Sequence, residues 1–435
     1  MKKIILSTIS LFLLYTAAFS QVTVDAKPWE NYRPLDQSGI NVFEPQKEAT
    51  TPISGLKAKI GAGFTQQFQS LSHENAGGTA LYPRLKAGFG IAQANLYTDF
   101  LVSEGISLNL NTYLSSRHHN EAWVKGGFIQ FDKLPFKGEG WDRLMENVRV
   151  KVGHMEVNYG DAHFRRSDGG HSLYNPFMEN YIVDAFATEV AAEVEYHAGN
   201  IMVMGGLSNG LINGGYQVPI VAGTEVKRSP SIYGKLAYDN HAGREDVRLR
   251  VAGSVYYNNA PGRSTLFSGD RTGSNYFFVM EGATANAKDN AFSGRVNPGF
   301  SQQVAAAQLN ALVKASGLEF FGTFETAKGR GQAEKNADFD ARGFNQIAGD
   351  LVYRFGPQEN VFLGARYNTV NGKMLASSND KQTISRFAVG GGWFVTPQVL
   401  AKVEIVSQNY KDYPTSSIFR EGKFNGFVFE AIVGF

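Results

Sequence analysis

The sequence predicts an all-β protein, a transmembrane antiparallel β-barrel of about 16 strands with short periplasmic turns and long extracellular loops. Three observations support this fold class. The chain begins with an export signal, it has no later apolar run long enough for a membrane-spanning helix, and alternating apolar residues recur to its last residue. Because backbone polar groups in lipid must be paired internally, only helices and closed barrels span membranes, and the alternation favours a barrel.

The N-terminus has the three parts of a secretory signal. Lys2 and Lys3 precede an apolar run from residue 4 to 15, and small residues follow up to Ser20. The predicted division of the chain is a signal peptide at 1–20, an N-terminal periplasmic or plug segment at 21–54, and a transmembrane β-barrel at 55–435.

Composition excludes several classes of function. Of 42 Lys and Arg residues, Lys2 and Lys3 belong to the signal, so the mature chain carries 40 basic and 40 acidic side chains. A nucleic-acid-binding protein would show a basic excess, so we expect no nucleic-acid partner. The absence of cysteine removes disulfides and thiol chemistry.

Strands are recognised where every second residue is apolar. A clear example is Val247, Leu249 and Val251, which alternate with Arg248 and Arg250. The predicted strands are 55–70, 85–104, 106–117, 121–132, 147–159, 188–198, 200–209, 229–239, 245–258, 304–316, 318–329, 344–355, 359–370, 384–395, 398–410 and 423–435. If one pair of these strands is wrongly assigned, the strand count becomes 14 or 18.

The connections differ in length on the two sides of the predicted barrel. Those after even-numbered strands are mostly tight, as at Gly105 and Gly199, whereas those after odd-numbered strands are long, up to 259–303. This asymmetry is typical of outer-membrane barrels and places both termini in the periplasm. The exceptions are a long turn at 133–146 and a short loop at 118–120.

The C-terminal strand and the aromatic residues support an outer-membrane location. One apolar face of the last strand ends on Phe435, the final residue, which we expect to be the assembly signal for the barrel-assembly machinery. Aromatic residues near strand ends predict girdles at the two membrane interfaces: Tyr196, Tyr238, Tyr257, Tyr353, Trp393 and Tyr410.

A barrel of this size leaves an aqueous channel unless something fills it. By strand phase, the basic residues predicted to line the lumen are Lys57, Lys59, Arg149, Lys151, Lys235, Arg248, Arg250, Lys314, Arg354, Arg366, Arg386 and Lys402. The acidic ones are Asp99, Glu189, Glu193, Glu195, Glu319, Glu325, Asp350, Glu404 and Glu430. This near balance predicts weak or no charge selectivity.

The connection at 161–187 is too long and too amphipathic for a simple exposed loop. In many porins the loop at this position folds into the barrel and narrows it. We therefore expect a pore constriction formed by His163, Arg165, Arg166, Asp168 and His171; the alternative is an extracellular loop whose charges face solvent.

The segment 148–161, VRVKVGHMEVNYGD, resembles the phosphate-selective porin O and P family. It keeps Gly153 and Gly160 but has Asn158-Tyr159 where that family has Pro-Phe. The resemblance implies sixteen strands, a homotrimer and, in selective members, an arginine ladder. No such ladder maps onto this sequence residue by residue, so phosphate selectivity is not carried over.

The sequence contains no catalytic set and no cofactor motif, so we expect no enzyme activity, no metal and no cofactor. The adjacent His118 and His119 point to opposite faces of a strand and are interpreted as a polar loop. The main hypothesis is an outer-membrane porin for passive diffusion of small hydrophilic solutes or ions, with membrane lipid and the assembly machinery as partners. Two alternatives stay open: a plugged barrel that transports a specific, even hydrophobic, substrate, and a barrel subunit of a larger outer-membrane assembly.

Overall fold

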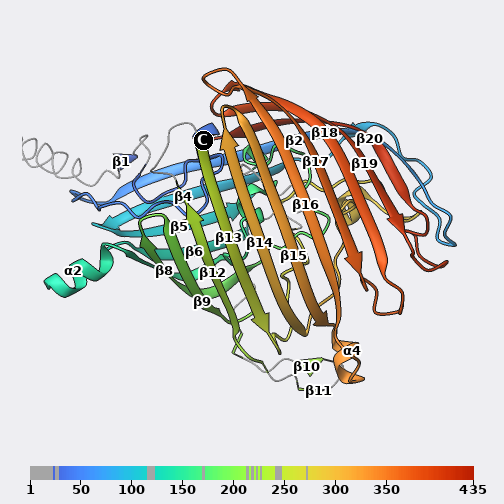
Figure 1. The fold of residues 1–435 in the computed structure, drawn as a ribbon, viewed down its shortest axis with the longest axis horizontal. Helices are drawn as coiled ribbons and strands as arrows, with labels where there is room; N and C mark the ends of the chain where they lie inside the picture. Colours follow the sequence, from blue (N-terminus) through green and yellow to red (C-terminus); the bar gives the residue numbers. More distant parts are fainter. Residues whose placement is uncertain are drawn as a thin grey trace, which may run out of the picture.

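The protein is described by a computed structural model, which covers residues 23–24, 29–114, 123–168, 172–211, 215–216, 220–221, 224–225, 228–240, 247–270 and 273–435. Its wall is a closed antiparallel β-barrel of 16 strands (Figure 1). Neighbouring strands in the chain pair with each other, and the first and last barrel strands pair to close the ring.

The barrel strands are β2 (Lys57–Glu74), β4 (Gln93–Ser103), β5 (Ile106–Tyr113), β6 (Trp123–Phe131), β7 (Val148–Glu156), β8 (Thr188–Ala198), β9 (Ile201–Ser208), β12 (Ser231–Asp239), β13 (Val247–Asn258), β14 (Gln303–Ala315), β15 (Leu318–Arg330), β16 (Arg342–Phe355), β17 (Val361–Gly372), β18 (Gln382–Thr396), β19 (Val399–Lys411) and β20 (Lys423–Gly434). The other described elements are short: β1 (Thr23–Val24), β3 (Gly88–Phe89), β10 (Ile220–Val221), β11 (Thr224–Glu225), η1 (Gln37–Gly39), α2 (Glu139–Met145), η2 (Ala162–Arg165), α3 (Ala287–Asn290) and α4 (Gln332–Asn336). No described helix has the length and apolar character needed to cross a membrane.

The predicted strand count and order are confirmed. The turns that join β4 to β5, β8 to β9 and β14 to β15 are short, and they lie at one end of the barrel, here called the short-turn end. Helix α2 lies in the longer turn at this end, and α4 lies in the β15–β16 loop at the opposite, long-loop end (Figure 1). The short loop expected at 118–120 falls outside the described residues.

One predicted strand is shorter than expected. The strand predicted at 85–104 begins only at Gln93, and Gly88–Phe89 forms a separate short strand on β2. Gly88 and Gly90 flank an exposed Phe89, and glycine weakens a strand interior because it has no side chain to pack. The β2–β4 ladder accordingly ends at the pair Thr65 and Gln93.

The outer face of the barrel is apolar. On β16, exposed Ile347, Leu351 and Tyr353 alternate with buried Asp350 and Arg354. An apolar exterior with polar groups inside is the arrangement that a wall in contact with lipid requires.

Five of the six predicted girdle residues are exposed on the outer face: Tyr196, Tyr238, Tyr257, Tyr353 and Trp393. The prediction for Tyr410 is wrong, because this side chain is 1% exposed and packs inside against Tyr413 and Phe419. It has the same strand phase as the inward Lys402, so its position follows from the alternation of β19.

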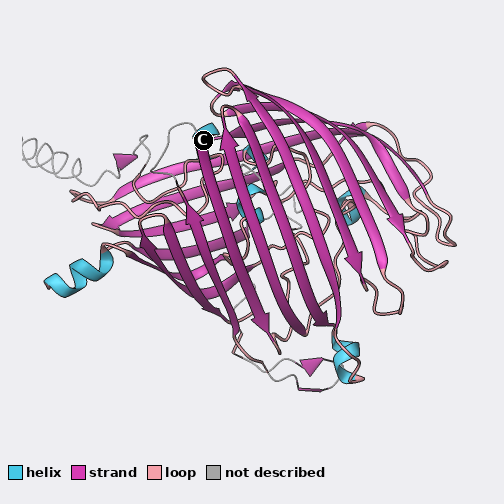
Figure 2. Cartoon of the chain, viewed as in Figure 1, coloured by secondary structure: helices cyan, strands magenta, loops and turns pink. Residues whose placement is uncertain are grey.

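Three segments fill much of the barrel interior (Figure 2). We name them the N-terminal segment (residues 29–50), the inner loop (157–187, between β7 and β8) and the cap loop (259–302, between β13 and β14). Apolar side chains of the inner and cap loops pack against inward apolar residues of β12–β20 in one continuous core. The inner face of β2–β7 is instead largely polar, with residues such as Asn95, Asp99, Asn109 and Gln130.

Candidate functional site in the barrel interior

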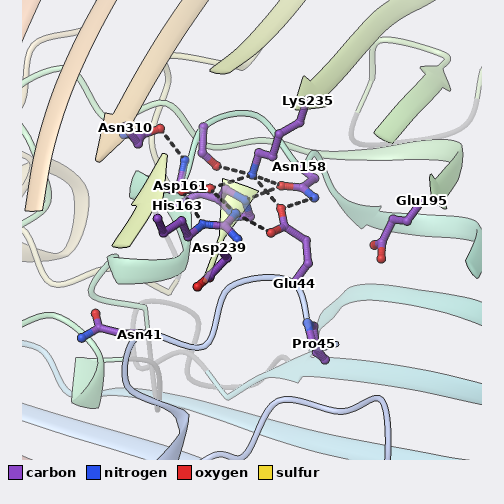
Figure 3. Close-up of polar contacts among 12 residues, drawn as sticks. Asn41, Glu44, Pro45, Asn158, Asp161, His163, Glu195, Lys235, Asp239 and Asn310 are labelled. Atoms are coloured by element: carbon purple, nitrogen blue, oxygen red, sulfur yellow. Dashed lines mark hydrogen bonds and ion pairs between the residues drawn. The ribbon is translucent and has the colours of Figure 1, made fainter. Parts of the chain in front are cut away.

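The N-terminal segment is attached to the barrel interior by Glu44. Its carboxylate accepts hydrogen bonds from Lys235 Nζ (2.9 Å), Arg250 Nη2 (2.6 Å) and Asn158 Nδ2 (2.9 Å) (Figure 3). Burial alone would raise the pKa of this carboxyl, but Lys235 and Arg250 outweigh it and hold that pKa well below its usual range. Glu44 is therefore ionised and forms a buried ionic anchor for the segment.

Two further contacts of the N-terminal segment flank Glu44. The Phe43 ring lies 5.7 Å from the Phe164 ring on the inner loop and 6.3 Å from the Phe321 ring on β15, measured between centroids. Asn41 Nδ2 donates a hydrogen bond of 2.8 Å to Glu319 on β15. The segment thus contacts both the inner loop and the wall.

The structure places four of the five predicted constriction residues inside the barrel. Residues His163, Arg165, Arg166 and Asp168 are all buried on the inner loop, and His171 lies outside the described residues. Burial lowers the pKa of His163, which favours its neutral form. Their effect on the bore of a pore stays a prediction.

The two arginines of this group are bound to carboxylates. Arg166 binds both oxygens of Asp184 at 2.7 Å, and Arg165 donates to Glu319 on β15 at 2.8 Å. Although burial raises the pKa of Asp184, Arg166 outweighs that effect and lowers it. Bidentate pairing of this kind fixes geometry as well as charge, so these arginines hold the inner loop in place.

Asp168 connects the inner loop to the polar half of the wall. It contacts Lys125 Nζ on β6, and Asn95 Nδ2 on β4 donates to it at 3.3 Å. Lys125 Nζ also lies 3.2 Å from Asp270 of the cap loop. Burial would raise the pKa of Asp270, but the ammonium of Lys125 and the guanidinium of Arg166 lower it to about 2. The inner loop, the cap loop and the wall therefore meet at one lysine.

The predicted lumen-lining basic residues lie on the inner face, but they do not simply face water. Arg366 binds both oxygens of Asp350 at 2.6 and 2.8 Å, and Lys402 lies 2.6 Å from Glu430. Ion pairs with a carboxylate are found for ten of the twelve: Arg149, Lys151, Lys235, Arg248, Arg250, Lys314, Arg354, Arg366, Arg386 and Lys402. The interior charges are therefore largely compensated within the protein.

The cap loop covers the inner loop from the long-loop end. The Tyr276 hydroxyl donates to Asp184 at 2.7 Å, and the Phe277 backbone N–H donates to Glu179 at 2.7 Å. Sequence reasoning did not identify Asp184 as an interior anchor, because loop residues have no strand phase.

Cavities follow the β2–β7 wall. An inner cavity of about 240 Å³ is lined by side chains such as Lys59, Asp99 and Asn111, and a second of about 220 Å³ opens at the short-turn end. These two cavities share Asn31 and Tyr32 of the N-terminal segment. The polar half of the interior therefore has space next to the wall.

A third cavity of about 220 Å³ lies towards the long-loop end and includes Gln67 and Gln93. Between it and the inner cavity, the inner loop contacts the wall through several polar side chains. Asn95 bonds to Asp168, Lys125 pairs with Asp168, and the hydroxyls of Thr65 and Ser172 bond at 3.2 Å. These contacts form a barrier between the two cavities.

Within the described part of the chain, no group of three or more His, Asp or Glu side chains is placed to hold a metal ion.

No family model and no curated protein matches this chain. Among solved structures, it is similar to an anion-selective porin from Comamonas acidovorans, with 9% identity and a TM-score of 0.54 over 87% of this chain and 100% of that one. It is also similar to the outer-membrane channel DcaP of Acinetobacter baumannii, with 11% identity and a TM-score of 0.50 over 89% of this chain and 100% of that one. The chain thus has the barrel fold of outer-membrane porins, in agreement with the predicted location.

Proposed function

We propose that this protein is an outer-membrane channel of restricted bore, through which small hydrophilic solutes or ions diffuse along the β2–β7 wall. The observation that carries the proposal is the line of cavities beside the largely polar inner face of this wall. Beside β12–β20 an apolar core fills most of the interior, and a cavity of about 510 Å³ next to Lys314 and Arg354 lies at the short-turn end. Solutes that pass the barrier between Asn95 and Asp168 would enter the inner cavity and leave beside Tyr32.

The compensated interior charges support weak ion selectivity. An arginine whose guanidinium is bound to a buried carboxylate, such as Arg366 with Asp350, offers little net positive potential to an anion. Phosphate selectivity, known in members of the phosphate-selective porin O and P family, would require uncompensated cations along the route.

The test is the conductance of the refolded mature protein in a planar bilayer under a salt gradient. We expect small, steady conductance steps with a small reversal potential. Asn95→Ala should raise the conductance because it removes one hydrogen bond of the barrier, whereas Asn371→Ala, whose exposed side chain bonds to Thr383 on the neighbouring strand, should leave it unchanged. A strong anion potential would favour a phosphate-type channel, and silence of the folded protein would reject an open channel.

A second candidate function is a plugged barrel that opens only when the N-terminal segment leaves. The docking of this segment through Glu44, Phe43 and Asn41 favours it. If the intact chain is silent and deletion of residues 21–50 creates steady conductance, the plugged barrel is correct. If both proteins are silent, the barrel is better explained as a subunit of a larger assembly.

A further inference from the structure

The wall of the barrel is incompletely paired between β6 and β7. Their ladder covers five positions and ends at the pair Gly127 and His154, whereas β7 and β8 pair over nine positions up to Glu156 and Thr188. On the side that faces β7, the backbone of residues 123–126 in β6 pairs with no described strand. We call this part of the wall the seam; it is bordered by Lys125 and Gly126 on β6 and by Met155 and Glu156 on β7.

Local backbone features account for the seam. Gly153 on β7 has φ of +147°, and a Cβ at this position would lie 2.4 Å from the carbonyl oxygen of Gly127. Only glycine tolerates this conformation and approach, so β7 turns away from β6 here. On β6, the register with β5 shifts between Asn111 and Thr112, which leaves Lys125 as an extra, bulged residue.

The inner cavity reaches through the wall at the seam. By strand alternation, His154, Glu156 and Thr188 share the outward phase of the exposed Val152 and Val190. These three outward-phase residues nevertheless line the inner cavity together with inward residues of β5 and β6. In addition, His163 of the inner loop bonds to Glu156 at 2.7 Å, so an interior side chain contacts an outward-phase residue across the seam.

The seam lies at the margin of the apolar outer face. Along β8, towards the long-loop end, the outward residue changes from apolar Val190 to polar Thr188 at the level of the seam. On β6 the outward Val124 is 70% exposed. Since unpaired backbone is not tolerated in contact with hydrocarbon, the edge of the seam requires a polar molecule or water beside it.

We propose that the seam is a lateral portal between the inner cavity and the outer leaflet, and that it binds an amphiphile with an uncharged, hydroxyl-rich head. The tail would lie in the membrane beside Val124, Val152 and Val190, and the head would enter the inner cavity. The head would share the inner cavity with the proposed diffusion route, but it would reach the cavity through the wall rather than through the ends of the barrel.

The chemistry of the inner cavity selects this head group. Most of its charged residues have counter-charges on the protein: Lys59 is the cross-strand partner of Asp99, and Lys151 lies 3.4 Å from Glu193. The exception is Arg33, which forms no described ion pair and whose Nη2 is buried without a described hydrogen-bond partner. Apart from Arg33, a net charge on the ligand would find no unpaired counter-ion among the residues that line the cavity. The side chain of Asn111 lines the cavity, and its Oδ1 is a buried acceptor that receives no hydrogen bond from a described residue, so a hydroxyl group would satisfy it.

The absence of native cysteine allows a direct test in lipid vesicles. Asn109→Cys places a single thiol in the inner cavity and leaves the Asn111 acceptor in place, and Gln69→Cys places a thiol in the long-loop-end cavity, away from the seam. Each variant is treated with a water-soluble maleimide and with a membrane-confined dodecyl maleimide. Folding is checked first by the shift of the heat-modifiable band on a gel.

We expect the dodecyl reagent to label Asn109→Cys about tenfold faster than Gln69→Cys, because thiol reactivity follows access. Octyl glucoside should protect Asn109→Cys from the water-soluble reagent, and octyl sulfate at the same concentration should not. Labelling of Asn109→Cys by the water-soluble reagent alone would overturn the portal, and equal protection by the two amphiphiles would overturn the assignment of the head group. Neither result depends on whether the barrel conducts ions.

Discussion

The ionic anchor at Glu44 predicts how firmly the N-terminal segment is docked. In Glu44→Gln the side chain keeps its size but loses the charge that binds Lys235 and Arg250. Removing one partner of a buried ion pair costs about 3–5 kcal/mol. Because Asp161 and Asp239 still face these two cations, we expect about 3 kcal/mol, the lower end of that range.

This loss changes the docking equilibrium by a measurable factor. At about 1.4 kcal/mol per factor of ten, the ratio of docked to undocked segment falls about a hundredfold. Backbone amides of residues 31–48 should then exchange hydrogen about a hundredfold faster, because exchange reports local opening. Mass spectrometry of the protein in detergent or lipid nanodiscs resolves this segment from strand peptides such as those of β19.

Glu48→Gln is the matched control, because Glu48 lies in the same segment but is exposed. Its exchange should equal that of the unmodified chain. If Glu44→Gln exchanges at the unmodified rate, or if the two variants accelerate alike, the buried anchor does not hold the segment.

Three further predictions concern the ends and the ion pairs of the barrel. Deleting Phe435 should reduce the folded fraction in the outer membrane, seen on heat-modifiability gels, because its backbone bonds to β2 are lost with it. Arg366→Gln should lower the free energy of unfolding by about 3–5 kcal/mol, since Asp350 is left buried without its bidentate partner; thermal unfolding in detergent measures this. The folded-state pKa of Asp270, about 2, is below the ordinary value of about 4, so its pairing with Lys125 stabilises the cap loop above that pH. Hydrogen exchange of residues 273–280 should accelerate as the pH falls from about 4 to about 2.

Each of these three predictions can be contradicted by a specific result or checked with a control variant. Phe427→Leu preserves the length of the chain, so an equal assembly defect would show that packing rather than the terminal residue matters. Arg263 is exposed, and a loss in Arg263→Gln as large as that in Arg366→Gln would indicate a general effect of charge. In Asp270→Asn the acid-dependent change in exchange should disappear.

The wall of this barrel was predictable because its signal is local. Strand β13 is recognisable from the alternation of Val247, Leu249 and Val251, and no distant residue is needed to interpret it. The same alternation correctly predicted that Arg250 points into the barrel. The partners of Arg250 were not predictable, because Asp161 and Glu44 lie 89 and 206 positions away in sequence, in segments without strand periodicity.

One signal of the filled interior was nevertheless present in the sequence. Val352 on β16 and Phe362 on β17 have the inward phase of Asp350 and Arg366, and both are almost completely buried. A wall that faces water would not be expected to present such residues inward, so apolar residues at inward positions indicate protein inside the barrel. The expectation of an aqueous channel rested on the size of the barrel and on the charged inward residues, and it left these positions out.

The contacts of the two interior segments determine which of them can move. The inner loop is held through its backbone: the N–H groups of Met178, Ile182 and Val183 donate to Glu404, Asn368 and Gln346 on β19, β17 and β16. Displacing it would leave these buried polar groups unpaired at about 1–3 kcal/mol each, in addition to its apolar core. The N-terminal segment is held mostly through side chains, such as Asn31 with Arg149 and Lys47 with Asp132, together with a backbone bond from Gln37 to Pro397. We therefore expect the N-terminal segment to leave the barrel more readily than the inner loop, and we expect the inner loop to set the bore.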